Sequence, residues 1–249
     1  MLKLVCGEPA LIHNKTLVVA DLHLGIENEF AARGIRIGSL TDSTKEGIIS
    51  LARAFRARRI LLLGDVKHNV PNISWQEYTE LPGFFAALQR IAEVEVVPGN
   101  HDGGLERSTN ARIHPSSGFI EGNVAFAHGH AWPSEEAMRA DYLVLAHSHP
   151  AIELIDKMGY RSIEKVWVVG GIGKTARERY PNANLKMKVI IMPAFNELVG
   201  GAVLNRARGA REGLLGPLLK NEIFKLDDAQ VFLLSGVPLG KIRDLRKNL

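Results

Sequence analysis

Five short apolar runs, each followed at once by polar residues that can bind a metal, constrain this chain more than any other feature. The runs are Leu17–Ala20, Ile60–Leu63, Val94–Val97, Val124–Ala127 and Leu143–Ala146. Apolar runs of this length, almost without polar alternation, predict strands that are buried on both faces. The chain therefore requires a layered α/β fold, in which both faces of a sheet are covered.

The residues that follow the five runs share one chemical character. They are Asp21-Leu22-His23, Gly64-Asp65-Val66-Lys67-His68, Pro98-Gly99-Asn100-His101-Asp102, His128-Gly129-His130 and His147-Ser148-His149. Of the nine histidines, only His13 and His114 fall outside these segments. Ligands bind at the carboxyl ends of the strands in α/β sheets. We therefore predict that these segments meet in one site.

The donor types in these segments indicate a pair of metal ions. Carboxylate, imidazole and an Asn carbonyl, without thiolate, suit divalent Mn, Fe, Zn or Ni ions. One bridging carboxylate can hold two ions ~3.5–4 Å apart, where they polarise a phosphoryl group and supply a bound hydroxide for in-line attack. The single cysteine, Cys6, excludes an internal disulfide. A cytoplasmic, reducing location is therefore expected.

Helical patterns separate and follow the strands. We expect helices at roughly Thr41–Arg59 and Pro82–Ala92, and a third from near Pro133 and Ser134. After His149 the expected strands are Ala151–Ile155, Val166–Val169, Lys188–Met192, Ala202–Leu204 and Val231–Leu234. These predict a second, mainly antiparallel or mixed sheet packed on the first, with helices outside both. The expectation is one domain, 1–249, with the motifs in 17–149 and the second sheet and a basic C-terminal segment in 150–249.

The stretch from Gly170 to Lys186 is polar and rich in glycine, and we expect a surface loop there. Its Gly173-Lys174-Thr175 is not interpreted as a phosphate-binding loop, because Val168 stands where that motif requires glycine.

Taken in order, Asp-x-His, Gly-Asp-x-x-His, Gly-Asn-His-Asp, His-Gly-His and His-x-His resemble the calcineurin-like metallophosphoesterase superfamily over residues 17–149. The resemblance implies a four-layer sandwich of two mixed β-sheets flanked by helices. It implies two divalent ions, with Mn²⁺ the first expectation and Fe, Zn or Ni the alternatives. One ion would be held by Asp21, His23 and His149, the other by Asn100, His128 and His147, and Asp65 would bridge them. By the same resemblance His101 is the general acid or stabiliser of the transition state, and Asp102 orients it. The alternative for His101 is a further metal ligand, which its place beside Asn100 disfavours.

His68 and His130 are less specific. His68 stands where many phosphatases of the superfamily carry Asp, which is similar to the SbcD-type DNA-repair nucleases and to small prokaryotic phosphoesterases, some of which accompany DNA ligases. We favour contact with the substrate phosphate or proton shuttling for His68. His130 either forms a hydrogen bond within the site or lines its rim. Ala146 departs from the glycine that commonly precedes the last His-x-His motif.

The leading hypothesis is metal-dependent hydrolysis of phosphate esters by a phosphodiesterase or nuclease-like enzyme. The alternative is a phosphomonoesterase or phosphoprotein phosphatase, which would need cations such as Arg33, Arg36 or Lys67 to hold a dianionic phosphate. A binding protein that has lost catalysis is disfavoured, because the set of metal ligands is complete.

The net charge of the chain does not decide which class of substrate or partner it binds. A net charge of +4 permits nucleic acid or nucleotide as substrate without requiring it. The C-terminal third is basic through Arg206, Arg208, Arg211, Lys241, Arg243, Arg246 and Lys247, which forms either a track for nucleic acid or a solvated face. Trp75 and Tyr78 are expected in a loop facing the site, where they stack on a base or anchor the loop. No apolar run approaches the ~20 residues that cross a membrane, and the oligomeric state is not set by these features.

Overall fold

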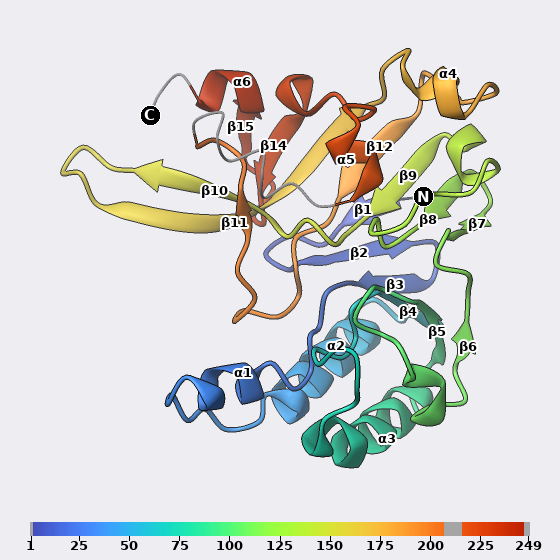
Figure 1. Ribbon diagram of the computed structural model, residues 1–249, viewed down its shortest axis with the longest axis vertical. Helices are drawn as coiled ribbons and strands as arrows, with labels where there is room; N and C mark the ends of the chain where they lie inside the picture. Colours follow the sequence, from blue (N-terminus) through green and yellow to red (C-terminus); the bar gives the residue numbers. More distant parts are fainter. Residues whose placement is uncertain (1, 207–215, 247–249) are drawn as a thin grey trace.

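The computed structural model describes residues 2–206 and 216–246 of the chain. Two β-sheets lie face to face, with helices on both outer sides (Figure 1). This arrangement confirms the predicted α/β class of two mixed sheets flanked by helices.

The first sheet has six strands in the order β1-β2-β3-β4-β5-β6. The strands β1 (Leu2–Leu4), β2 (Ala10–His13) and β3 (Thr16–Val19) pair antiparallel, and β4 (Arg59–Leu63), β5 (Glu93–Val97) and β6 (Arg112–Ile113) extend the sheet in parallel from β3. Alternate side chains face opposite layers, so that Leu17 packs towards the helices and Val18 towards the second sheet. Burial on both faces explains why the sequence of β3 is continuously apolar.

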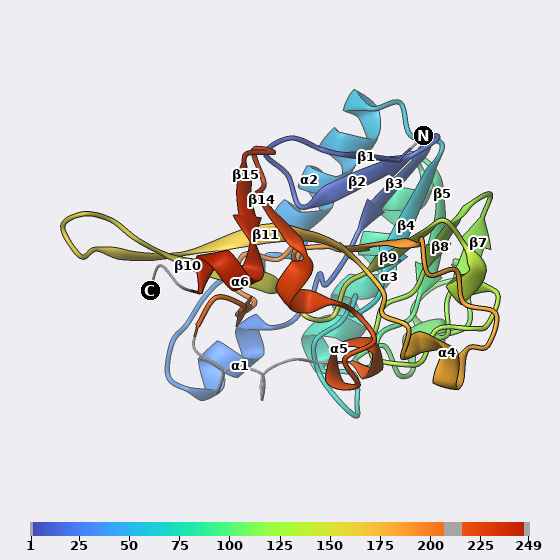
Figure 2. The ribbon, with the colours of Figure 1, turned by 90° about the horizontal axis from the view of Figure 1, so that it is seen from above.

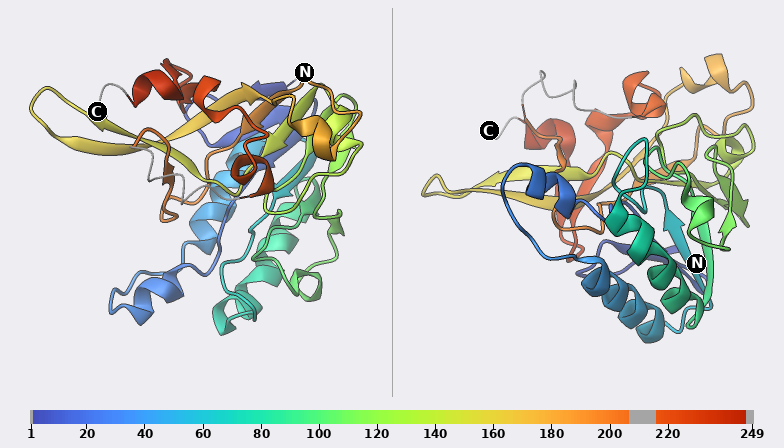
Figure 3. Two further views of the ribbon diagram at one scale, coloured as in Figure 1. Left: turned by 45° about the horizontal axis from the view of Figure 1, so that its top comes forward. Right: turned by 60° about the horizontal axis from the view of Figure 1, so that its bottom comes forward.

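Helices α2 (Thr41–Ala54) and α3 (Trp75–Gln89) cover the outer face of the first sheet, and α1 (Glu27–Ala32) follows β3 (Figure 3). α2 ends before the expected Arg59, because Arg56 adopts a left-handed conformation with φ of 49° and β4 begins at Arg59. α3 begins at Trp75 rather than at Pro82. Ser74 and Glu77 form a capping box at its start, and Pro82 lies inside the helix.

The second sheet begins earlier than residue 150, which corrects the expected division. It consists of β7 (Phe119–Glu121), β8 (Val124–Phe126), β9 (Tyr142–Leu145), β10 (Pro150–Ile155), β11 (Arg161–Gly171), β12 (Lys188–Ile191), β13 (Ala202–Val203), β14 (Gln230–Leu233) and β15 (Pro238–Lys241). β9 pairs in parallel with both β8 and β12. An apolar run shows that a strand is buried, but not which sheet it joins, so two of the five motif-bearing strands were assigned to the wrong sheet.

Short helical elements complete the fold. They are η1 (Leu105–Arg107), η2 (Ala137–Arg139), α4 (Ala176–Arg179), α5 (Pro217–Lys220), η4 (Leu226–Asp228) and α6 (Ile242–Leu245). The helix expected from Pro133 and Ser134 is only the 3₁₀ turn η2, because Ala140 is already extended and leads into β9. The expected loop from Gly170 is shorter than predicted, since β11 runs to Gly171 and α4 interrupts the rest.

Three apolar clusters hold the layers together. One lies between the two sheets, around Val18, Leu61, Val144 and the fully buried Trp167, and the other two lie between each sheet and its helices. The β10–β11 hairpin projects away from this body (Figure 2). Within the described ranges, no helix has the length and hydropathy to cross a membrane. Direct packing of one sheet on the other brings strand ends of both sheets to a common edge.

Candidate metal centre

The predicted ligands lie where β3, β4 and β5 of the first sheet and β8 and β9 of the second sheet end. Five of them have left-handed backbone conformations: φ is 55° at Asp21, 43° at His23, 48° at Asp65, 66° at His147 and 40° at His149. Such angles are uncommon for residues other than glycine and cost free energy. Among the described residues, only three other non-glycine residues share them, namely Asn14, Arg56 and Glu222. The strain is therefore concentrated at this site.

Four side chains form a first group of donors. Asp21, His23, Asp65 and His149 each place a donor atom within 4.8 Å of the others. The Nε2 atom of His23 lies 3.6 Å from Oδ2 of Asp65, and Nε2 of His149 lies 3.3 Å from Oδ1 of Asp21. The group matches the predicted first metal site together with the predicted bridge.

Asp65 also belongs to a second group. It shares a 4.8 Å neighbourhood with His128 and His147, and Nε2 of His128 lies 3.6 Å from its Oδ2 atom. Asn100 follows β5 at the same edge with an exposed side chain. The next residue, His101, donates its backbone N–H to Oδ1 of Asp65 at 2.9 Å. The structure thus brings the six predicted His and Asp ligands together, and Asn100 follows β5 at the same edge.

The donors fit a pair of divalent cations. The Nε2 atoms of His23 and His149 are buried, and neither forms a well-aligned hydrogen bond with a described residue, although Nε2 of His149 lies 3.3 Å from Oδ1 of Asp21. A buried polar atom without a partner is costly, and native structures rarely leave one. A cation would satisfy both nitrogens, and the imidazole and carboxylate donors suit the borderline divalent ions.

Burial sets the charge of the site. It lowers the pKa of His23 to about 2, and burial together with the charge of His128 lowers the pKa of His147 to about 3. Burial opposes ionisation of Asp21, but His149 and His128 outweigh it and hold the pKa of Asp21 below its ordinary value. His23, His147 and Asp21 are thus in the forms that bind metals, whereas contacts with Asp21 raise the pKa of His128 and His149, whose protons a cation must displace.

Gly64 allows the second group to form. Its φ is +80°, and a Cβ built on it would lie 2.2 Å from Cδ2 of His128. Only glycine combines this backbone conformation with such a close approach. The glycine before Asp65 is therefore a requirement of the site.

His68 and His101 lie beside the first group. Their rings stack with centroids 5.5 Å apart, and the Nδ1–H of His101 donates to the backbone carbonyl of His68. The Nδ1 atom of His68 lies 3.2 Å from Nδ1 of His23, and its Nε2 lies 3.0 Å from Oε2 of Glu29. The two predicted catalytic histidines therefore face the metal ligands and hold each other in place.

Asp102 has a different place from the one expected. Its buried carboxylate accepts backbone N–H bonds from Val66 at 2.8 Å, from Lys67 at 3.2 Å and from Gly99 at 2.8 Å. A bond from Asp102 to His101 is not among the hydrogen bonds of the described residues. Asp102 ties together the loops after β4 and β5, and the carbonyl of His68 orients His101.

Three residues that the sequence left undecided or unnoticed support the site. His130 places its Nδ1 3.0 Å from Nδ1 of His128 and so fixes that ring. Glu77 accepts the backbone N–H groups of His68 at 2.9 Å and Asn69 at 2.7 Å. Asn196 donates from Nδ2 to the carbonyl of Leu22 at 2.7 Å. The Ser-x-x-Glu pattern at the start of α3 is a readable signal for Glu77. The segment from Pro193 to Asn196 follows a strand, but the sequence alone does not show that Asn196 faces the site.

The basic C-terminal track is largely neutralised where it is described. Arg206 pairs with Glu153 at 2.9 Å, Arg243 with Asp228 at 2.7 Å and Arg246 with Asp227 at 2.5 Å. Arg208, Arg211 and Lys247 lie outside the described residues. These ion pairs favour a solvated face over a nucleic-acid track for this segment.

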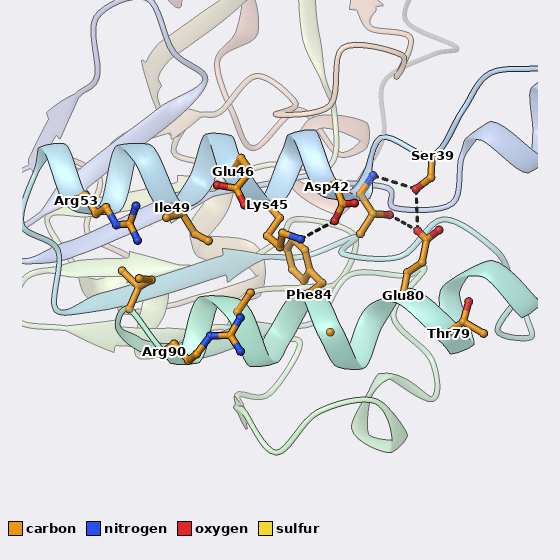
Figure 4. A pocket seen from close by; sticks show the side chains of 14 residues that line it. Ser39, Asp42, Lys45, Glu46, Ile49, Arg53, Thr79, Glu80, Phe84 and Arg90 are labelled. Atoms are coloured by element: carbon orange, nitrogen blue, oxygen red, sulfur yellow. Dashed lines mark hydrogen bonds and ion pairs between the residues drawn. The ribbon is translucent and has the colours of Figure 1, made fainter.

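A cavity of about 510 Å³ lies between α2 and α3, apart from the metal ligands (Figure 4). Glu80 accepts bonds from Ser39 at 2.8 Å and Thr41 at 2.5 Å at one end of it, and Lys45 pairs with Asp42. Some of the charged side chains that line this cavity therefore form ion pairs or hydrogen bonds with neighbouring residues. None of the predicted metal ligands lines the cavity.

Comparison with known proteins shows which family this chain and its candidate metal centre belong to. A family model of calcineurin-like phosphoesterases matches residues 15–174. The fold is similar to that of nuclease MPE from Pseudomonas putida, with a TM-score of 0.59 and 18% identity over 94% of this chain and 93% of that one. YfcE, a phosphoesterase from E. coli, matches 55% of this chain and 71% of its own, with a TM-score of 0.36 and 19% identity. No curated protein matches the chain. The chain belongs to the calcineurin-like phosphoesterase family and is a hydrolase of phosphoric esters.

Proposed function

We propose that this protein hydrolyses phosphodiesters in a nuclease-like reaction that depends on two divalent ions, with Mn²⁺ the first candidate. The observation that carries the proposal is the position of Asp65, which is shared by two groups of metal donors. A carboxylate common to both groups is what a bridging ligand requires.

Bound ions in such a centre polarise the phosphoryl group and lower the pKa of a coordinated water. The chain's own residues supply the remainder. The carbonyl of His68 accepts a hydrogen bond from Nδ1–H of His101. In the doubly protonated ring, Nε2–H would donate a hydrogen bond or its proton to the leaving oxygen, and the ring would remain as the neutral Nδ1–H form. His68 lies between Glu29 and His23, beside the same metal ligands.

The surrounding cations favour a diester. A monoester carries two negative charges and needs additional cations, whereas a diester carries one. Arg33 is paired with Glu29 at 2.6 Å, and the ammonium of the fully buried Lys67 donates to the carbonyl of Asn69. Among the described residues, Arg36 forms no ion pair like that of Arg33 and no side-chain hydrogen bond like that of Lys67. A nuclease that shares the fold gives a precedent for diester substrates.

The test is Mn²⁺-dependent hydrolysis of bis(p-nitrophenyl) phosphate compared with the monoester p-nitrophenyl phosphate. We expect a higher kcat/KM for the diester. Asp65→Asn should abolish this activity, and Asp42→Asn, an exposed carboxylate on α2, should retain it. A clear preference for the monoester would reject the diesterase proposal, and activity of Asp65→Asn equal to the wild type would reject the metal centre.

A further inference from the structure

Trp75 and Tyr78 are two large aromatic side chains that the fold leaves in solvent. Trp75 is 79% exposed and Tyr78 is 64% exposed, and their rings stack with centroids 5.9 Å apart and an interplanar angle of 28°. Tryptophan is usually well buried, and a side chain this exposed does not anchor a loop. The pair lies in the first turns of α3, not in the loop expected from the sequence.

The pair is connected to the metal centre through Glu77, which lies between the two aromatic residues in sequence. The carboxylate of Glu77 accepts the backbone N–H groups of His68 and Asn69, and it also accepts the N–H of Ser74 at 2.7 Å. The first turn of α3 is therefore fixed to His68. Because α3 follows β4, it starts at the carboxyl end of that strand, which is the edge that bears the metal ligands.

The segment between α1 and α2 borders the same turn. Asn28 of α1 donates to Ser74 at 3.4 Å, and Ser39 at the end of the segment donates to Glu80 at 2.8 Å, so α1 and the end of the segment contact the N-terminal half of α3. Arg36 is exposed within this segment. An exposed guanidinium in a segment that contacts α3 offers a charge for a phosphate of a nucleic-acid strand, and the exposed aromatic rings offer surfaces for its bases.

We propose that Trp75 and Tyr78 form a stacking platform for an unpaired base of the nucleic-acid strand whose phosphodiester lies at the metal centre. A base inside a duplex has both faces covered by its neighbours, whereas an unpaired base offers a face to an aromatic ring. The inference rests on the proposed diesterase function and deepens it: the substrate is single-stranded nucleic acid or an end with unpaired nucleotides.

The experiment compares two substrates in Mn²⁺: a single-stranded oligodeoxynucleotide, and the same strand with abasic residues flanking the cleaved bond. The measured quantity is the ratio of kcat/KM for the intact strand to that for the abasic strand. The binding free energy of stacking one base on an aromatic ring corresponds to a ratio of roughly 5 to 100. Trp75→Ala should bring the ratio towards one, and Trp75→Phe should restore most of it.

Tyr160 provides a matched control. It is 72% exposed at the turn of the β10–β11 hairpin, away from α3. Tyr160→Ala should keep the wild-type ratio. A second measurement uses full-length Asp65→Asn protein and a fluorescently labelled intact strand, whose anisotropy reports binding without turnover. Adding Trp75→Ala to this protein should weaken binding by a factor similar to the change in the ratio.

Each outcome decides the inference. A ratio near one in the wild type, or an unchanged ratio in Trp75→Ala, overturns the platform and leaves the diesterase intact. Loss of self-association in Trp75→Ala, with the ratio unchanged, would assign the pair to an interface between copies of the chain. If the wild type cleaves neither strand and neither nitrophenyl ester, the proposed function itself fails.

Discussion

Gly99 lies directly against the carboxylate of Asp65. A Cβ built on Gly99 would lie 2.0 Å from Oδ1 and 2.4 Å from the backbone nitrogen of Asp65. Contacts this short do not occur between real atoms, so any side chain at position 99 must displace Asp65. Since Asp65 is shared by both groups of donors, a single methyl group would disturb both metal sites at once.

Gly99→Ala should therefore weaken the binding of both ions and lower kcat by about 100-fold or more, the scale of losing one preorganised charge in an active site. Metal binding by calorimetry and turnover on the diester measure the effect. Gly103→Ala is the matched control in the same loop, because a Cβ there meets nothing within 4 Å. Equal activities of the two variants would contradict the close approach.

Asp65→Asn should change the number of bound metals. An amide is neutral, and its single carbonyl oxygen is a poor bridge between two cations. We expect bound Mn²⁺ measured by mass spectrometry to fall from two ions to one or none, with the circular dichroism spectrum unchanged. Asp42→Asn serves again as control, and two tightly bound ions in Asp65→Asn would show that Asp65 does not bridge.

Metal affinity should rise with pH. Burial opposes protonation of His128 and His149, but their contacts with Asp21 outweigh it and raise the pKa of both above the ordinary 6.5. Without metal these imidazoles hold protons that a cation must displace, so affinity falls as pH decreases below their raised pKa values. His23 and His147, with pKa values of about 2 and 3, are already neutral there and add no dependence. Calorimetric titrations at pH 6 and pH 8 in buffers of different ionisation enthalpy should show proton release at pH 6, and none at either pH would contradict the assignment.

Removing the metal should lower the thermal stability of the protein. A ligand present at about 100 times its Kd stabilises the folded state by about 2.7 kcal/mol, which for a chain of this length corresponds to a rise in Tm of about 5–10 °C. Scanning calorimetry with Mn²⁺ and with a chelator measures the difference. The Asp65→Asn variant should show a smaller shift, and an identical shift in both proteins would place the stabilising ion elsewhere.

Glu77→Gln should destabilise the loop that carries His68. Burial disfavours the charged form of Glu77, but the backbone bonds of Asn69 and Ser74 outweigh it and lower its pKa below the ordinary 4.5. The ionised carboxylate therefore stabilises the fold above pH 4.5, and this contribution is lost as pH falls through the lowered pKa. We expect a loss of about 1–3 kcal/mol at pH 7, measured by urea unfolding, and a smaller difference near pH 3. Glu46→Gln on the exposed face of α2 should lower the free energy of unfolding much less at both pH values.

The sequence predicted the structure best where a residue type is compatible with only one environment, as apolar runs are with buried strands. The apolar runs and their polar ends predicted both the strands and the edge where the ligands meet, because burial on two faces excludes polar residues until the strand ends. It was less informative about pairing: Val144 and Leu61 are equally apolar, yet they belong to different sheets. Pro82 has the character of a helix start, but the capping box of Ser74 and Glu77 begins α3 seven residues earlier, at Trp75. The contact of Asn196 with Leu22 joins residues 174 positions apart, and no local pattern encodes it.

The metal donors come from strands of both sheets, and this affects the protein while it is being made. Domains emerge from the ribosome with their N-terminal part first, so β1 to β6 are available for pairing before β8 and β9 exist. β9 in turn lies between β8 and β12, which ends at Ile191. We therefore expect nascent chains and proteolytic fragments that end before Ile191 to be unable to cut phosphoric esters, so that hydrolysis begins only after β12 has been synthesised.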